Sequence, residues 1–229
     1  TCPSWLSVSH TAGASTATLS GTPLNANVGD NSVVISVADA ASATGTQSFT
    51  IVVANANDAP TITSTAVTAA TEDAAYTYTV TAADADSGDT VTLTGTTVPS
   101  WLTFTASTGV LAGTPLDANV GDNNVVITAS DGNGGSATDT FTITVANTND
   151  APAVSSTAVT SATEDSSYSY SITTSDDDSD SSDSWTISCT TCPSWLSVSH
   201  TAGASTATLS GTPLNANVGD NSVVISVAD

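Results

Sequence analysis

The sequence contains no lysine and no arginine among its 229 residues, and this absence restricts its function more than any other feature. Its 22 aspartate and glutamate residues give a formal net charge of −22 at pH 7. Nucleic-acid binding needs cationic side chains and is excluded, and the same absence argues against docking on an anionic membrane surface. Because no carboxylate can pair with Lys or Arg in this chain, each must be solvated, hydrogen-bonded or neutralised by an inorganic cation.

Long apolar runs and catalytic motifs are also missing. No stretch approaches the roughly 20 apolar residues of a membrane-spanning helix. The two histidines, His10 and His200, are copies of one repeat position, and the sequence has no nucleophile elbow, phosphate loop or paired-histidine motif. We therefore expect no enzymatic activity. Aromatic residues make up only 5% of the chain, but a regular alternation of Val, Ile, Thr and Tyr argues against disorder.

What the sequence does contain is repetition. Residues 1–39 and 191–229 are identical, with an offset of 190 residues. A weaker repeat lies inside this one, since Asn-Asp-Ala-Pro occurs at residues 57 and 149, an offset of 92 (149 − 57). A period of this length fits one compact β-sandwich per unit and is too long for a solenoid. We predict the C-terminal part of one domain at 1–56, a complete domain at 57–148, and the N-terminal and central parts of a third at 149–229, of the same type as the first.

Strand patterns support an all-β fold. Residues 75–81, 90–94 and 140–145 alternate with period two, residues 124–129 are more continuously apolar, and Gly, Asp, Asn and Pro separate them. We predict tandem Greek-key β-sandwiches of about seven strands each, in an extended array. The expected core of the middle domain comprises Trp101 and Leu102 with Phe104, Phe141, Tyr76 and Val125. The alternative for Trp101 is an exposed aromatic binding platform.

The repeated motifs resemble a known family. The string Val126–Gly132 followed by Phe141–Pro152 looks like the end of a cadherin repeat. Thr-Glu-Asp, Tyr-x-Tyr, Pro-Ser-Trp-Leu and Gly-Thr-Pro in fixed order are similar to dystroglycan-type cadherin-like, or immunoglobulin-like, repeats of large bacterial surface proteins and adhesins. The resemblance implies a structural segment of a long extracellular or cell-surface fibre, stalk or adhesin shaft. Its partners would be neighbouring copies of the same repeat, including lateral self-assembly into fibres. A ligand-binding adhesin module for glycans or cell surfaces is the alternative.

The same resemblance implies Ca²⁺ between domains, held by oxygen ligands from the ends of both. The matching positions are a Glu near the domain start (Glu72, Glu164), the linkers (Asn55, Asn57, Asp58 and Asn147, Asn149, Asp150), Asp-x-Asp pairs (Asp84, Asp86 and Asp176, Asp178), and a late Asp (Asp131, with Asp39 and Asp229 at its position). We expect Asn57, Asp58, Asp84, Asp86 and Asp131 to form one site. We expect Glu72, Asn147, Asn149, Asp150, Asp176, Asp178 and Asp229 to form another.

This pattern departs from that of cadherins in two ways. Asn replaces the first linker Asp, and the mid-domain acidic motif has no evident match, so we expect one or two ions per junction. The alternative is that these acids are simply solvated.

Cys189 and Cys192 form a C-x-x-C pair just before Pro193. A disulfide, a zinc ligand pair and a redox motif are the three interpretations. Zinc needs a second pair that the sequence does not have nearby, and a redox motif needs a helix N-terminus in a thioredoxin-like context, so the disulfide is favoured. Cys2 is the counterpart of Cys192, and we expect it to have no partner in this chain.

Overall fold

The computed structural model describes residues 1–178 and 184–229. The fold is all-β, as predicted, and only three short 3-10 turns interrupt the described strands. No helix in the described part of the chain is long and apolar enough to cross a membrane. By its contacts the chain divides into two compact units, one of residues 1–68, 77–113 and 124–143, the other of residues 69–76, 114–123 and 144–229. The domain boundaries expected at 57 and 149 stay a prediction.

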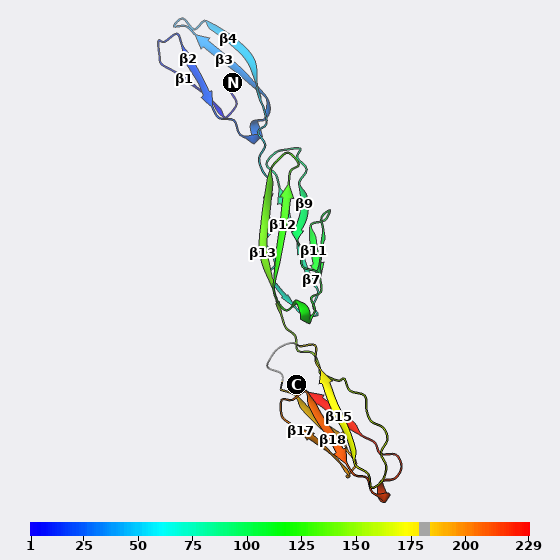
Figure 1. The fold of residues 1–229 in the computed structure, drawn as a ribbon. Helices are drawn as coiled ribbons and strands as arrows, with labels where there is room; N and C mark the ends of the chain where they lie inside the picture. Colours follow the sequence, from blue (N-terminus) through cyan, green and yellow to red (C-terminus); the bar gives the residue numbers. More distant parts are fainter. Residues whose placement is uncertain (179–183) are drawn as a thin grey trace. The chain divides into compact units, whose positions relative to one another are not determined.

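The first stretch of the chain contains two β-hairpins (Figure 1, blue). One joins β1 (Leu6–His10) to β2 (Ala17–Gly21), and the other joins β3 (Gly29–Ala38) to β4 (Thr44–Val53). The second ladder is ten residues long and runs in unbroken register from Gly29↔Val53 to Ala38↔Thr44.

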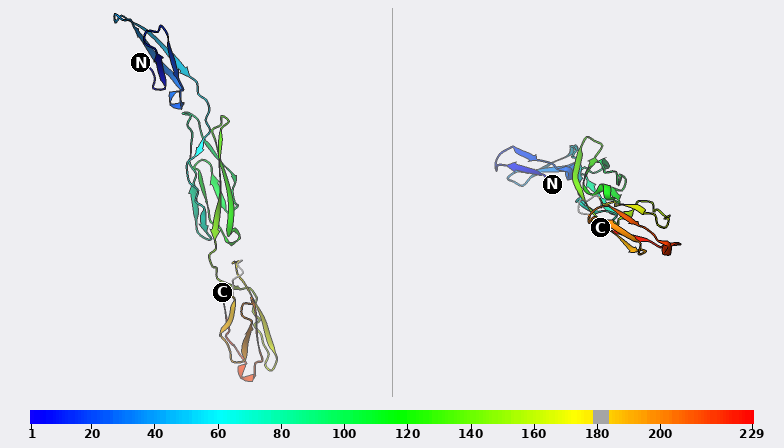
Figure 2. Two further views of the ribbon diagram at one scale, coloured as in Figure 1. Left: turned by 90° about the vertical axis from the view of Figure 1, so that its left-hand side faces the viewer. Right: turned by 60° about the horizontal axis from the view of Figure 1, so that its bottom comes forward.

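The middle stretch forms two facing sheets. The first has the order β6-β13-β12-β9 and the second β10-β11-β7, while β5 pairs with β8. Their bounds are β5 Thr61–Ile62, β6 Ala69–Thr71, β7 Tyr76–Thr79, β8 Ala82–Ala83, β9 Thr92–Thr97, β10 Leu102–Thr105, β11 Val110–Gly113, β12 Gly121–Ser130 and β13 Ser136–Ala146. β6 joins β13 in parallel, whereas β9 joins β12 antiparallel. Figure 2 (left) shows the strands of this stretch, drawn in green, running along roughly the same axis, as in an aligned sandwich.

The period-two pattern of the sequence places the core between these sheets. Val125, Ile127 and Ala129 of β12 are each fully buried, and Ile143 and Val145 of β13 lie beside them. Of the six expected core residues, Tyr76, Leu102 and Val125 are buried, whereas Trp101, Phe104 and Phe141 are half-buried. Phe141 packs edge-on against Tyr78, with ring centroids 5.7 Å apart. Both β-branched and aromatic residues thus fill the pleated interior, as their strand preference predicts.

The last stretch has a four-stranded sheet, β14-β15-β18-β17, and a two-stranded sheet, β16-β19. Their bounds are β14 Ala153–Val154, β15 Tyr168–Ser175, β16 Thr186–Thr191, β17 Leu196–His200, β18 Thr206–Gly211 and β19 Val224–Ala228. The core between them contains Tyr170, Ile172, Ile187, Leu196, Ala207 and Leu209.

A hydrogen-bond network explains why two motifs recur together. The indole Nε1 of Trp5 donates to Asn31 Oδ1 at 3.0 Å, and Trp195 donates to Asn221 in the same way at 3.0 Å. Asn31 Nδ2 in turn donates to the carbonyl oxygens of Asn27 and Gly29. This network ties Pro-Ser-Trp-Leu to the turn that follows a 3-10 segment, η1 (Asn25–Asn27) or η3 (Asn215–Asn217). After η2 (Asp117–Asn119), Asn123 Nδ2 likewise donates to the carbonyl oxygens of Asn119 and Gly121.

Gly-Thr-Pro begins with glycine for a steric reason. A Cβ on Gly21 would lie 1.9 Å from the Trp5 carbonyl oxygen, and one on Gly211 would lie 1.9 Å from that of Trp195. The close approach of the two backbones therefore excludes any side chain at this position.

Candidate metal centres

Three carboxylates from separate parts of the sequence meet in one cluster, which we call the Glu72 cluster. It consists of Glu72 after β6, Asp117 at the start of η2 and Asp178 after β15, and one carboxylate oxygen of each lies within 4.8 Å of the others. All three residues belong to the same compact unit. Glu72 is 2% exposed and Asp178 is 7% exposed. The cluster is therefore a concentration of buried negative charge.

Backbone and amide donors fix these carboxylates in place. Glu72 accepts from the Thr148 backbone N–H at 3.2 Å, and Glu72's own N–H donates to the Ala146 carbonyl oxygen. Asp178 accepts from the Asn147 side-chain amide at 2.8 Å and from the Asp150 backbone N–H at 2.5 Å. The last residue of β13, Ala146, and three residues of the segment after it thus orient the cluster.

The local electrostatics favour binding of a cation. Burial raises the pKa of Glu72, the Thr148 N–H opposes this, and the negative charges of Asp117, Asp150 and Asp73 raise the pKa further. Burial likewise raises the pKa of Asp150, and neighbouring aspartates, Asp73 first, add to the effect. Like charges held together in a partly desolvated site repel one another. A bound cation would remove this repulsion.

A second group, the Asp131 cluster, contains Asp84, Asp89 and Asp131, again with carboxylate oxygens within 4.8 Å of one another. Asp131 follows β12, is 4% exposed, and accepts from the backbone N–H groups of Asn133 and Gly135. The Asn57 side-chain amide also donates to Asp131 at 2.9 Å, and this bond is the main reason that the pKa of Asp131 is lowered. The geometry thus keeps Asp131 ionised.

Linker residues reach this second cluster as well. The Asp58 backbone N–H donates to Asp86 at 2.7 Å, and the Asp86 N–H donates to Asp84 at 2.9 Å. Asp58 also accepts from the Asn25 amide at 2.6 Å. The arrangement parallels the Glu72 cluster, where Asp150 and Asp178 correspond to Asp58 and Asp86.

Several carboxylate oxygens in the two regions are buried without a hydrogen-bond partner among the described residues. They are Asp84 Oδ2, Asp86 Oδ1, Asp89 Oδ2, Asp117 Oδ1 and Asp176 Oδ2. Buried charged oxygens in proteins are normally paired or bind a metal. Sets made only of carboxylate, amide and backbone oxygens suit Ca²⁺ or Mg²⁺ rather than zinc. The donor set therefore fits a hard divalent cation.

Comparison with known proteins identifies the family. A family model described as "Putative Ig domain" (He_PIG) matches residues 1–54, 59–146 and 151–229. The chain belongs to the Putative Ig domain family. No curated protein matches the sequence.

Solved structures with the same cadherin-like architecture resemble these Putative Ig domains. PcdhgB3 EC1-4 has 16% identity over 97% of this chain, with a TM-score of 0.61. Protocadherin Gamma B7 extracellular cadherin domains 1-4 have 19% identity over 97% of it, with a TM-score of 0.53. This chain spans 59% of each of those chains. These likenesses show the fold.

An endo-fucoidan hydrolase of glycoside hydrolase family 107 has 28% identity over this whole chain, which spans 36% of that protein. Its TM-score is 0.38.

The Putative Ig domains bring many of the expected ligands together, but not all of them. One cluster brings together Glu72, Asn147, Asp150, Asp176 and Asp178. The side-chain amide of Asn149 instead donates a hydrogen bond to the Asp229 carboxylate at 3.0 Å. Asn57, Asp58, Asp84, Asp86 and Asp131 gather at the other. Glu164 and Asn55 are exposed, and Asp39 caps its own turn by accepting from Ala41 and Ala43. That these residues bind Ca²⁺ stays a prediction.

Sequence reasoning missed Asp89 and Asp117. Asp117 stands where the neighbouring repeats have Asn25 and Asn215, within an otherwise shared Leu-x-Ala-Asn segment. This single difference between repeats was the available signal.

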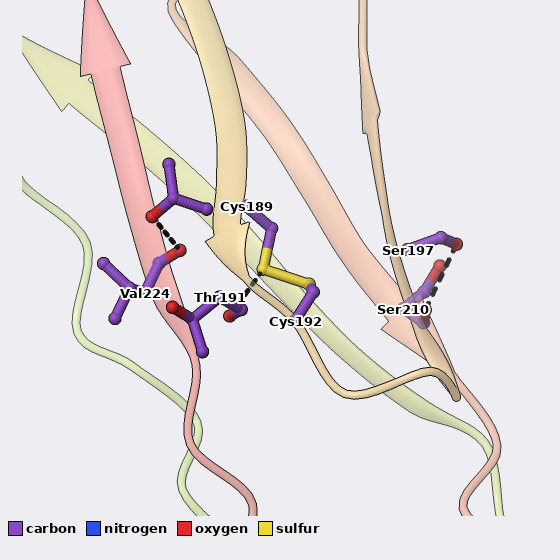
Figure 3. Close-up of a disulfide and its surroundings, with 7 residues drawn as sticks. Cys189, Thr191, Cys192, Ser197, Ser210 and Val224 are labelled. Carbon is purple, nitrogen blue, oxygen red and sulfur yellow. Dashed lines mark hydrogen bonds between the residues drawn. A yellow bond between two sulfur atoms is a disulfide. The ribbon is translucent and has the colours of Figure 1, made fainter.

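The structure joins Cys189 and Cys192 by a disulfide, with Cα atoms 5.7 Å apart. Figure 3 shows the bridge at the end of β16, beside β19. The register of these two strands shifts between Cys189 and Thr191, so the bridge spans an irregular strand end. Cys2 is a free thiol.

Proposed function

We propose that this chain is a structural segment of an extracellular fibre, stalk or adhesin shaft whose repeats are stiffened by Ca²⁺. The observation that carries the proposal is the Glu72 cluster, in which three carboxylates meet within 4.8 Å in a sequence without any Lys or Arg. Since the sequence contains no Lys or Arg that could neutralise them, we infer that a metal ion is their partner of opposite charge.

Ca²⁺ fits this cluster better than other ions. It accepts six to eight oxygens in irregular geometry, which a mixture of side chains from a loop, a 3-10 turn and a strand end can supply. Glu72, Asp117 and Asp178 would hold it, with Asp150 and Asp176 adjacent. The bound ion would fix the segment after β13 to the carboxylates, and so limit movement at that point of the chain.

A shaft also explains why residues 1–39 recur unchanged at 191–229. The sequence has no nucleophile elbow, phosphate loop or paired-histidine motif. We infer a non-enzymatic role on this basis. A disulfide is typical of oxidising compartments, which supports an extracellular location.

Calorimetric titration of the metal-free 229-residue chain tests the proposal. We expect Ca²⁺ to bind and to raise the melting temperature, because it binds only the ordered clusters. Asp117→Asn should weaken the binding at the Glu72 cluster roughly tenfold or more. Asp122→Asn is the matched control, because it removes the same charge at an exposed position outside the cluster. Asp122 accepts a hydrogen bond from the Thr144 hydroxyl. Absence of Ca²⁺ binding, or equal loss in both variants, would refute the proposed sites.

Small-angle scattering tests the structural role of the ion. A chelator should convert a stiff particle into a more flexible ensemble. An unchanged scattering curve would leave Ca²⁺ as a ligand without a stiffening role.

A further inference from the structure

The turn after β12 contains the single asparagine–glycine pair of the 229-residue sequence, Asn133-Gly134. Both residues are exposed, and the Asn133 side chain has no hydrogen-bond partner among the residues that the structure describes. Gly134 has a φ of +110° and, like every glycine, carries no Cβ beside its backbone nitrogen. No side chain at Gly134 thus hinders the approach of that nitrogen to the amide carbon of the preceding asparagine.

The turn itself does not require this pair of residues. Its counterpart in the first stretch follows β3, where Asp39 accepts from the backbone N–H groups of Ala41 and Ala43, both at 2.9 Å. Asp131 is held in the same way by the N–H groups two and four residues later, at 2.7 and 2.9 Å. Ala41 and Ser42 stand where the middle stretch has the asparagine and the glycine, an offset of 92 residues (133 − 41). Since an alanine–serine pair builds the same turn, the hydrogen bonds of the turn do not explain the asparagine–glycine pair.

The end of this turn holds the linker that precedes the middle stretch. Gly135 packs so closely against that linker that an added Cβ would lie 2.8 Å from the Cα of Ala59. The Gly135 N–H donates to Asp131, and the side-chain amide of Asn57 donates to the same carboxylate at 2.9 Å. Lengthening the backbone just before Gly135 would displace its N–H and its contact with Ala59 together. Residues 57–59 would then lose part of their attachment.

We propose that Asn133 is a site of spontaneous deamidation that loosens the linker at residues 57–59 as the protein ages. The Gly134 backbone nitrogen attacks Cγ of Asn133, a nitrogen–carbon bond forms, and the bond from Cγ to the amide nitrogen breaks. Ammonia leaves with the proton of the Gly134 nitrogen, and a cyclic imide remains. Water then opens the imide at one of its two carbonyl carbons, which yields aspartate or isoaspartate. Water is the only co-reactant, and no electrons are exchanged.

Deamidation changes the turn in two ways. Either product adds one carboxylate next to the Asp131 cluster, whose negative charges already repel one another. Isoaspartate also routes the main chain through the former side chain of Asn133, which adds one carbon atom to the backbone immediately before Gly134. This insertion displaces Gly135, so its bond to Asp131 and its contact with Ala59 weaken. The modification needs no metal and goes beyond the proposed Ca²⁺ sites.

Peptide mapping of the 229-residue chain, aged in mildly alkaline buffer with chelator, tests the modification. Chymotrypsin is the protease of choice, because a chain without Lys or Arg offers trypsin no site. We expect mass spectrometry to show loss of the amide at Asn133 roughly tenfold or more faster than at any other asparagine. Isoaspartyl methyltransferase should methylate the aged chain but not aged Asn133→Ala. Intact Asn133 in a chain whose other asparagines have deamidated, or equal methylation of both chains, would overturn the proposal.

Thermal melts in chelator test the loosening. The aged chain should melt at a lower temperature than the fresh one. Asn133→Ala places the residue of the first turn, Ala41, in the second, so it should keep its melting temperature through the same incubation. Freshly prepared Asn133→Asp carries the added charge on a backbone of normal length and should melt between the fresh and aged chains. An unchanged melting temperature after full deamidation would refute the loosening, and Asn133→Asp melting as low as the aged chain would refute backbone lengthening as its cause.

Discussion

The side-chain amide of Asn147 donates to the carboxylate of Asp178 at 2.8 Å, across 31 residues of sequence. The resemblance to cadherin repeats places an Asp at this linker position. With Asn at this position the Glu72 cluster has one negative charge fewer. The amide N–H also bonds an Asp178 oxygen that would otherwise be available to a metal. The cluster is therefore less repulsive without metal and a weaker Ca²⁺ ligand set.

Asn147→Asp should reverse both effects. We expect Ca²⁺ affinity to rise roughly tenfold, about 1.4 kcal/mol, because a carboxylate replaces a neutral group. In chelator the same variant should melt at a lower temperature than the parent chain. Calorimetric titration and thermal melts measure the two effects, and Asn149→Asp, which alters the neighbouring pair with Asp229, serves as a comparison. Unchanged affinity would place Asn147 outside the metal's reach.

Glu72 predicts a pH dependence of stability in the metal-free protein. Burial raises the pKa of Glu72 from its ordinary 4.5, so the folded state binds this proton more tightly than the unfolded state does. The resulting stabilisation is complete below pH 4.5 and is lost as pH rises through the folded-state pKa. Glu72→Gln should therefore melt higher than the parent chain at neutral pH in chelator.

Ca²⁺ should invert that order, because it binds the ionised Glu72. With saturating Ca²⁺ at neutral pH, we expect Glu72→Gln to melt lower than the parent chain. Glu164→Gln, at an exposed position, is the control and should show neither effect. Melting curves at several pH values in both conditions decide the matter, and the same ranking in both would contradict a metal at Glu72.

The disulfide between Cys189 and Cys192 should contribute modestly to stability. It closes a loop with a sequence separation of three residues, for which the chain-entropy model gives about 2 kcal/mol. Replacing both cysteines by serine should lower the free energy of unfolding by about this amount in a denaturant titration. Cys2→Ser should change it little. Reaction of a thiol reagent with three cysteines in the unreduced protein would show that the bridge is absent.

Net charge predicts how neighbouring copies respond to salt. Each chain carries −22, so parallel copies repel at low ionic strength. Ca²⁺ can bridge carboxylates on two chains, whereas Na⁺ only screens them. We expect light scattering to rise more in Ca²⁺ than in Na⁺ at matched ionic strength. Coincident curves would restrict Ca²⁺ to the sites within one chain.

The fold was predictable because the alternation of apolar and polar residues along each strand indicates which side chains face the core. Alternation in residues 75–81 and 140–145 is the same period two that buries Tyr76, Tyr78, Ile143 and Val145. The partial exposure of Trp101 and Phe104 could not be predicted, because a period-two pattern assigns a face without saying how much of that face the opposite sheet covers.

The candidate sites were less predictable, since they depend on where distant loops end. Asp117 lies within 4.8 Å of Glu72 only because η2 and the end of β6 meet. Pattern matching found the linker residues that share motifs with cadherin repeats. It overlooked Asp117 and Asp89, whose importance depends on tertiary position.

The place of the middle sandwich between two identical segments affects folding within one chain. β4 can reach residues 29–38 across five residues (39–43), but residues 219–228 only across 165 (218 − 53). Closing the longer loop costs about 3 kcal/mol more in chain entropy. Separating identical sequences by a different domain thus favours the pairing of β4 with residues 29–38 as the chain folds. It disfavours mispairing between distant copies of the same sequence.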